Sequence, residues 1–316
     1  MATASSPALL LLTFATLSAQ TLQPESVFRI QPTETTRRLV SVDAAGNELL
    51  FCFSTPTTTE LVRTDPYGNE QARCTITGGS RQALFTPQTK SILLSRFGAS
   101  LTEVSPACEV WRDARFPRKH AHLLIDETDV LGVTGEAILS LDLATLQPGP
   151  DLPFPILGDD TPYFVRPTPG SLVVAYLGTG RTAFLDRKDP SPHVQQCLDP
   201  AVRQSSQQLG PNELLFAPAL GTWMGRVLFV LSGFRAQDGA PLYALSPDGN
   251  CARLGLLELP ELPASGAASA PNRQPPYPRR SVSPDFVVSA GNAVLLTDRR
   301  SGIVARYSLA QFPQPQ

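Results

Sequence analysis

The sequence is poor in charged residues and shows no excess of either sign. Only 17% of its 316 residues are Asp, Glu, Lys or Arg, whereas an average soluble domain has about 25%. The 26 basic side chains are nearly balanced by 28 acidic ones, which leaves a formal net charge of -2. Proteins dedicated to nucleic acids usually carry a clear basic excess. We therefore expect no nucleic-acid partner.

Motifs of several catalytic classes are also missing. The sequence has no Cys-x-x-Cys pair of the kind found in zinc and redox sites, and no G-x-S-x-G turn for a nucleophilic serine. Neither phosphate-binding motif, G-x-G-x-x-G after a strand or G-x-x-x-x-G-K-S/T, is present. We thus expect no cofactor, no metal and no set of catalytic residues, which favours a protein without enzymatic activity.

Long hydrophobic runs are absent as well. No stretch reaches the roughly 18 uninterrupted apolar residues of a membrane-spanning helix, so we expect no membrane span. The run Ala8 to Leu17, followed by Ser18-Ala19-Gln20, is typical of a secretory signal peptide that is cleaved near Ala19. We expect residues 1–19 to be removed and the mature chain to be secreted or periplasmic. A buried strand or helix at this run is the alternative.

Proline and glycine, in contrast, are abundant. The 31 prolines and 22 glycines disfavour long helices. Six segments of the chain repeat one order of elements: an apolar strand, a polar turn, a second strand of large apolar residues, a short loop and a third strand. The second strands of these units lie at residues 48–53, 91–95, 129–133, 171–176, 226–231 and 292–296.

A turn of related chemistry follows the third strand in four of the units. Asp or Ser opens the turn, where its side chain can accept hydrogen bonds from the backbone two residues on, and Pro then presets the next φ angle. These turns begin at Asp65-Pro66, Ser105-Pro106, Asp189-Pro190 and Ser246-Pro247. The recurrence indicates that a fourth, outer strand follows each turn.

The units follow one another at intervals of about 40 to 50 residues, which is typical of β-propeller blades with four short strands each. The chain resembles secreted bacterial β-propeller repeat proteins, the broad group that includes WD40-like, YncE-like and lactonase-like propellers. We predict an all-β, six-bladed β-propeller as a single domain over residues 20–316. Seven blades or a pair of β-sandwiches are the alternatives. The six units span residues 37–76, 82–116, 121–154, 161–198, 212–259 and 279–312.

Two segments outside the units have specific expectations. Ser26 to Ile30 reads as a lone strand, and as the outer strand of the last blade it would close the ring and cover open edges. Residues 260–280 contain six prolines without periodicity. We expect them to form an extended surface loop.

The five cysteines give a weak signal. Cys74, Cys108, Cys197 and Cys251 each follow the recurrent turn, so we place them at equivalent positions of different blades. Equivalent positions should lie beyond the roughly 7 Å between Cα atoms that a disulfide tolerates. We expect these four to be unpaired, and we leave open only a bond between Cys52 and Cys74.

The resemblance implies that the loops between blades, and those between second and third strands, gather on one face around the central channel. This loop-rich face would carry more arginine than acid, the acids including Glu60, and guanidinium groups suit carboxylate, phosphate or sulfate ligands. The other interpretation is that these side chains only solvate the rim. The candidate ligand-binding residues are Arg115, Arg118, His120, His122, Asp159, Asp160, Arg181, Arg235, Arg299 and Arg300.

His120-Ala121-His122 deserves a separate interpretation because alternate residues of a strand share one side. With Asp159 or Asp160 from the next loop, the two imidazoles could bind a transition metal. Two such ligands are a weak signal, and we favour a hydrogen-bonded structural pair.

The sequence therefore favours an exported, monomeric, non-enzymatic propeller that binds a protein, peptide or glycan through its loop-rich face. The alternative is a metal-dependent propeller hydrolase or lyase that acts on a lactone or polysaccharide. Convergence of at least three carboxylate, Asn or His side chains at the channel mouth would favour the alternative.

Overall fold

The structure, a computed structural model, describes most of the chain from Thr21 onward. The described residues are 21–87, 91–126, 128–134, 136–153, 162–168, 171–176, 181–186, 193–196, 216–223, 225–231, 239–246, 251–261 and 285–312. The predicted signal peptide and nearly all of the proline-rich segment lie outside them. In the described part of the chain, no helix has the length and apolar character needed to cross a membrane.

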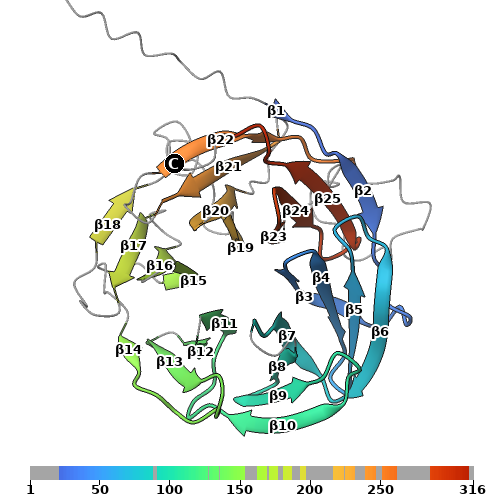
Figure 1. The fold of residues 1–316 in the computed structure, drawn as a ribbon, viewed down its shortest axis with the longest axis vertical. Helices are drawn as coiled ribbons and strands as arrows, with labels where there is room; N and C mark the ends of the chain where they lie inside the picture. The colour runs from blue at the N-terminus through green and yellow to red at the C-terminus, as the bar shows by residue number, and fades with distance from the viewer. Residues whose placement is uncertain are drawn as a thin grey trace, which may run out of the picture.

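Among the described residues, the strands form six sheets that follow one another around a central axis (Figure 1). The first sheet contains β3 (Arg38–Ala45), β4 (Glu48–Ser54), β5 (Thr58–Thr64) and β6 (Glu70–Thr77). The second contains β7 (Ser80–Phe85), β8 (Ile92–Arg96), β9 (Ser100–Val104) and β10 (Val110–Arg115). The third contains β11 (His122–Asp126), β12 (Asp129–Val133), β13 (Ala137–Asp142) and β14 (Leu152–Pro153).

The other half of the ring is built in the same way. The fourth sheet contains β15 (Pro162–Thr168), β16 (Ser171–Tyr176), β17 (Arg181–Asp186) and β18 (His193–Gln196). The fifth contains β19 (Phe216–Trp223), β20 (Arg226–Leu231), β21 (Ala240–Leu245) and β22 (Cys251–Leu257), with β1 (Thr21–Leu22) added. The sixth contains β23 (Phe286–Ala290), β24 (Ala293–Thr297) and β25 (Ile303–Ser308), with β2 (Ser26–Arg29) added.

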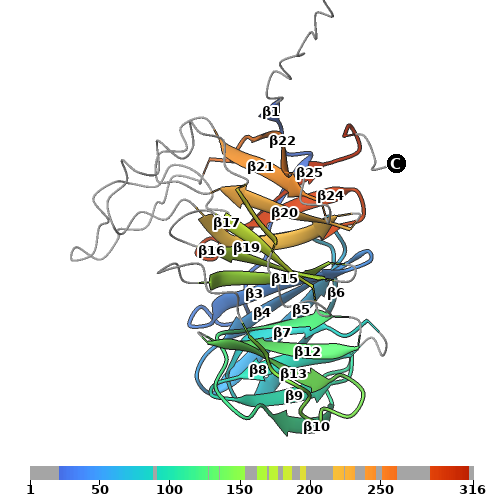
Figure 2. The same ribbon diagram turned by 90° about the vertical axis from the view of Figure 1, so that its left-hand side faces the viewer.

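In each sheet the first strand lies next to the axis and the last lies at the rim, so the sheets radiate outward (Figure 1). Seen edge-on, the strands run between the two faces of the ring, and consecutive antiparallel strands place their turns on alternate faces (Figure 2). This arrangement is a β-propeller, and the sequence-based prediction of an all-β propeller is confirmed.

The ring is closed by a strand from near the start of the chain. β2 pairs antiparallel with β25, from Ser26 opposite Arg306 to Arg29 opposite Ile303. The strand predicted from Ser26 is therefore the outer strand of the sixth sheet. β1 adds a parallel pair to β22 and buries Leu22 in the core, which the sequence did not predict because two residues show no strand periodicity.

The core lies between neighbouring sheets rather than around the axis. On β4, Leu49, Phe51 and Phe53 pack in the cluster shared with the sixth sheet, whereas Leu50 and Cys52 pack in the cluster shared with the second. Both faces of such a strand are therefore buried, because alternate side chains point to opposite neighbours. This double burial explains why the second strand of each unit reads as a continuous apolar run.

Polar side chains on the innermost strands join one sheet to the next. The Ala83 backbone N–H donates to Ser41 Oγ at 2.9 Å, and Gln82 both donates to the Leu123 carbonyl and accepts from the Leu123 N–H, at 2.9 and 2.7 Å. Each innermost strand has one edge without a strand partner, so these bonds satisfy backbone groups that would otherwise remain unpaired.

Two of the four recurrent turns, at Asp65-Pro66 and Ser105-Pro106, form as the sequence predicts, and those at Asp189-Pro190 and Ser246-Pro247 lie outside the described residues, apart from Ser246 itself. Asp65 Oδ1 accepts from the N–H groups of Tyr67 and Asn69, both at 2.9 Å. Ser105 Oγ accepts from the equivalent N–H groups of Ala107 and Glu109, at 3.2 and 3.0 Å. The side chain at the first turn position thus replaces backbone partners and fixes the path into the outer strand.

The expectation that Cys74 and Cys108 are unpaired is wrong. They form a disulfide between the first and second sheets with their Cα atoms 6.3 Å apart, while Cys52 is free and buried. The two positions are not equivalent: Cys74 lies within β6, whereas Cys108 lies in the turn before β10 with a φ of 65°. In the matching turn of the first sheet this left-handed position is held by Gly68.

The pairing left open between Cys52 and Cys74 is therefore also wrong. Cys52 is on the second strand of its sheet, deep in the core, and burial raises the pKa of its thiol to about 12. Cys197 and the side chain of Cys251 lie outside the described residues.

Candidate functional site

The predicted site residues fall into two separated groups. Arg115, Arg118, His120 and His122 lie at the end of β10 and the start of β11, between the second and third sheets. Arg299 and Arg300 lie in the turn between β24 and β25 of the sixth sheet, beyond the whole first sheet (Figure 1). Asp159, Asp160, Arg235 and the side chain of Arg181 lie outside the described residues. A single arginine-rich ligand site stays a prediction.

Arg118, Arg299 and Arg300 have local contacts. Arg118 forms ion pairs with Asp151 at 2.6 Å and Glu136 at 3.6 Å. The Arg299 guanidinium lies 4.9 Å from the centroid of the Phe286 ring, and the Arg300 backbone N–H donates to Asp298 Oδ1 at 2.9 Å. These contacts agree with side chains that solvate and order the rim.

His120 is a buried structural residue. It is 3% exposed, its Nε2 lies 2.8 Å from Ser95 Oγ, and its ring centroid lies 4.7 Å from that of Phe116. Burial, together with the positive charge of Arg81, lowers the pKa of His120 to about 4. No group of three or more His, Cys, Asp or Glu suited to a metal ion occurs among the described residues, which do not include Asp159 and Asp160.

This environment predicts an unusual titration. Of the three histidines in the chain, His120 should remain neutral until the pH approaches 4, which imidazole NMR shifts would measure. Histidine in the unfolded chain titrates near 6.5. Acidification from pH 6.5 to 4 therefore protonates the unfolded state first and lowers the free energy of unfolding. A histidine set in which every imidazole titrates above pH 6 would contradict the buried environment.

Glu60 is also buried, and it does not line the loop-rich face as an exposed acid. Its carboxylate accepts hydrogen bonds from the guanidinium groups of Arg37 and Arg73 and, at 2.8 Å, from Thr33 Oγ1. Desolvation alone would raise the pKa of Glu60, but the bonds from Arg37, Thr33 and Arg73 hold it below its usual range. Thr33 and Arg37 belong to the connection from β2 to β3, so this network attaches the ring-closing segment to the first sheet.

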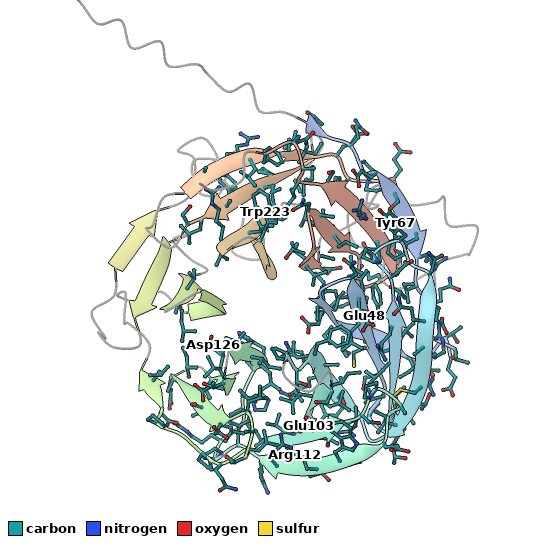
Figure 3. The ribbon with its side chains drawn as sticks, in the orientation of Figure 1. Glu48, Tyr67, Glu103, Arg112, Asp126 and Trp223 are labelled. Atoms are coloured by element: carbon teal, nitrogen blue, oxygen red, sulfur yellow. A yellow bond between two sulfur atoms is a disulfide. The ribbon has the colours of Figure 1, made fainter. Side chains whose placement is uncertain are left out.

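A comparable network joins the second and third sheets. Arg112 on β10 binds Glu103 on β9, and its other nitrogens donate to the carbonyls of Leu143, at 2.8 Å, and Ala144. Figure 3 shows Glu103 and Arg112 side by side near the rim of the second sheet. Both buried acids therefore serve the packing of sheets.

A groove of about 480 Å³, which the sequence did not predict, lies between the first and second sheets; we call it the inter-sheet groove. Two of its walls are apolar: Phe97 is 50% exposed and Val110 is 53% exposed. The groove is lined by Pro56, Thr77, Gly78, Gly79, Arg96, Phe97, Ser100, Thr102, Val110 and Asp113.

The polar part of the groove is fixed by its own hydrogen bonds. Arg96 donates to the Gly78 carbonyl at 2.8 Å and to Thr102 Oγ1 at 3.0 Å, and Thr102 in turn donates to Asp113 Oδ1 at 2.6 Å. Burial lowers the pKa of Arg96, while the charge of Asp113 opposes that shift. Arg96 thus stays in one place as a cation at the groove.

Gly79 allows Phe97 to stand at the groove wall. A Cβ at Gly79 would lie 2.4 Å from Cε2 of Phe97 and 2.2 Å from the Thr55 carbonyl oxygen, so no larger residue fits. Phe97 has a second contact, with the Arg81 guanidinium, which lies over the ring at 5.6 Å from its centroid. The adjacent glycines at 78 and 79 were the signal in the sequence for this close approach.

Comparison with known proteins supports the architecture. No family model matches the chain, and no curated protein matches it. Among solved structures, the Neurospora crassa Pan2 WD40 domain is 11% identical with a TM-score of 0.51, covering 93% of this chain and 96% of that one. The Cps50 (Swd1) β-propeller domain of Myceliophteria thermophila is 9% identical with a TM-score of 0.50, covering 90% and 99%. These likenesses show a β-propeller.

The same propeller fold is shared by an enzyme. A catalytically inactive virginiamycin B lyase from Staphylococcus aureus, solved with quinupristin, is 8% identical with a TM-score of 0.51, covering 90% of this chain and 99% of that one. Since a WD40 domain and a lyase have the same fold, the function of this propeller must be argued from its own surfaces.

Proposed function

We propose that this protein is an exported, monomeric, non-enzymatic propeller that binds an extended segment of a partner protein in the inter-sheet groove. The observation that carries the proposal is the exposure of Phe97 and Val110 in the same groove as the fixed Arg96–Thr102–Asp113 chain. Exposed apolar side chains next to a few oriented polar groups are typical of protein interfaces and ligand sites.

The groove favours an extended segment because β10 is the outermost strand of the second sheet. Among the described strands β10 pairs with β9 on one side, which leaves its outer backbone groups available for strand addition. Val110 and Asp113 both lie on β10, so an apolar and a basic side chain of the segment would meet them in turn.

Export is supported by two features. β1 begins at Thr21 and β2 at Ser26, so cleavage near Ala19 would leave β1 and the ring-closing β2 intact. The Cys74–Cys108 disulfide is a bond that secreted and periplasmic compartments maintain and the cytosol reduces.

Selection of displayed random peptides on the mature chain, residues 20–316, tests the proposal. Selected peptides should lose about tenfold or more in affinity for Phe97→Ala, a change of about 1.4 kcal/mol, because this ring is a main apolar wall of the groove. Tyr67→Ala is the matched control, since Tyr67 is 59% exposed, does not line the groove and does not lie on β10. Failure to select peptides, or equal binding to Phe97→Ala, would overturn the proposal.

A further inference from the structure

A second pocket, of about 400 Å³, lies between the first and sixth sheets. We call it the closure pocket, because Arg306 in its wall lies on β25, the strand that pairs with β2. It is lined by Asn47, Asp65, Pro66, Tyr67, Gln71, Ala290, Gly291, Asn292 and Arg306. The turn before β4, which carries Asn47, belongs to the closure pocket, and the turn after β4, which carries Pro56, belongs to the inter-sheet groove. The two ends of a strand lie on opposite faces of the ring, so these two sites open on opposite faces.

Two copies of one sequence motif deliver amides to the closure pocket. Ala-Gly-Asn occurs at residues 45–47 and at residues 290–292, each time as the turn between the first two strands of a sheet. Gly46 and Gly291 have φ values of 59° and 57°, and a Cβ there would meet no atom within 4 Å. Glycine is therefore needed for the left-handed backbone of a two-residue hairpin.

The consequence of this turn is that Asn47 and Asn292 approach the pocket from two different sheets. A third carboxamide comes from Gln71 on β6. Within the described part of the chain, these amides make no side-chain hydrogen bond, so their donors and acceptors are available to a ligand.

Tyr67 supplies an aromatic surface that is fixed in advance. Its ring is 59% exposed, and Figure 3 shows it beside the closing strands. The turn that carries it is held by Asp65, and Gly68 sits against Phe28, where a Cβ would lie 2.4 Å from the ring. The Arg306 guanidinium lies 4.8 Å from the Tyr67 ring centroid and restrains it further.

The charged groups of the closure pocket already have partners. Arg306 forms an ion pair with Glu25, and the carboxylate of Asp65 accepts from the Asn69 backbone and side chain at 2.9 and 2.7 Å. What remains for a ligand is an aromatic face and three carboxamides. Aromatic faces pack against the C–H surface of a sugar ring, and carboxamides match hydroxyl groups as both donors and acceptors.

We propose that the closure pocket binds a neutral saccharide. Its volume is near the lower end of the roughly 300–1,000 Å³ of small-molecule sites, which suits a short oligosaccharide or the end of a longer one. This site is separate from the inter-sheet groove, and each proposal can fail without the other.

Calorimetric titration of the mature chain with cellohexaose, maltohexaose, xylohexaose, laminarihexaose and chitohexaose tests the inference, with pentagalacturonate as the charged comparison. At least one neutral sugar should bind, and Tyr67→Ala and Asn292→Ala should each weaken binding by about tenfold or more. Trp111→Ala, which removes an exposed aromatic outside the pocket, should leave binding within about twofold.

Three results would overturn the inference: no binding of any neutral sugar, binding that neither variant weakens, or stronger binding of pentagalacturonate. Asn292 lies in an exposed two-residue turn, so Asn292→Ala still tests the pocket if Tyr67→Ala disturbs folding. Melting temperatures equal to that of the unmodified chain establish which variants are folded.

Discussion

Glu60→Gln is expected to lower the free energy of unfolding by roughly 3–5 kcal/mol, the cost of removing one partner from a buried ion pair. The Glu60 side chain is fully buried, and that of Arg37 is only 5% exposed. Glutamine would keep the shape of the side chain but remove the buried negative charge, which leaves Arg37 and Arg73 paired only with Glu34 and Glu70, whose side chains are 59% and 44% exposed. Urea unfolding at neutral pH measures the difference.

The matched control for Glu60→Gln is Glu48→Gln. The Glu48–Arg63 pair is also within the first sheet, but its side chains are 37% and 20% exposed. Partly exposed pairs contribute about 1 kcal/mol or less. Equal losses for the two substitutions would contradict a special role for the buried pair.

The same carboxylate makes stability depend on acid. The folded pKa of Glu60 lies below the ordinary value of 4.5, so the unfolded chain takes up this proton first as the pH falls. The Glu60 contribution is therefore complete above about pH 5 and is lost as the pH drops through 4.5 toward the folded pKa. In the Glu60→Gln variant, the free energy of unfolding should therefore depend less on pH in this range.

Removing the disulfide should be the second large effect. The bonded cysteines are 34 residues apart, and loop-closure entropy gives about 3 kcal/mol for 15 residues and about 4.7 for 100. We expect Cys74→Ser with Cys108→Ser to lower the free energy of unfolding by about 4 kcal/mol. A reducing agent should have the same effect on the unmodified chain and little further effect on the double variant.

Peptide mapping identifies the bond directly. A non-reduced tryptic digest should contain residues 74–81 linked to residues 97–112, because cleavage after Arg73, Arg81, Arg96 and Arg112 isolates one cysteine in each peptide. The two peptides recovered separately with alkylated thiols would disprove the pairing.

The fold was predictable because its signals are local. Strands of the second position read as apolar runs, and the Asp65-Pro66 and Ser105-Pro106 turns carry their own hydrogen-bonding side chains. These strands and turns could be predicted from residues that are close in the sequence. The cysteine prediction failed because it assumed one repeat position for both partners, and a shift of Cys108 into the turn brings it to the neighbouring sheet.

The candidate sites were harder to predict from the sequence because each joins segments that are distant in the sequence. Glu60 was expected on an exposed face, and its partners Arg37 and Arg73 come from different elements. The inter-sheet groove and the closure pocket each combine side chains from two sheets. The repeated Ala-Gly-Asn turn was visible in the sequence, but its two copies become neighbours only when the ring closes.

The closing of the ring sets an order for folding. Glu25 binds Arg306, which is 281 positions further along the chain, so the first strands to leave the ribosome must wait for the last. Contacts of such long sequence separation form slowly. A chain that crosses a membrane unfolded would complete its ring only after the C-terminal strand has followed, and any truncation before β25 would leave β2 without its partner and the sixth sheet open.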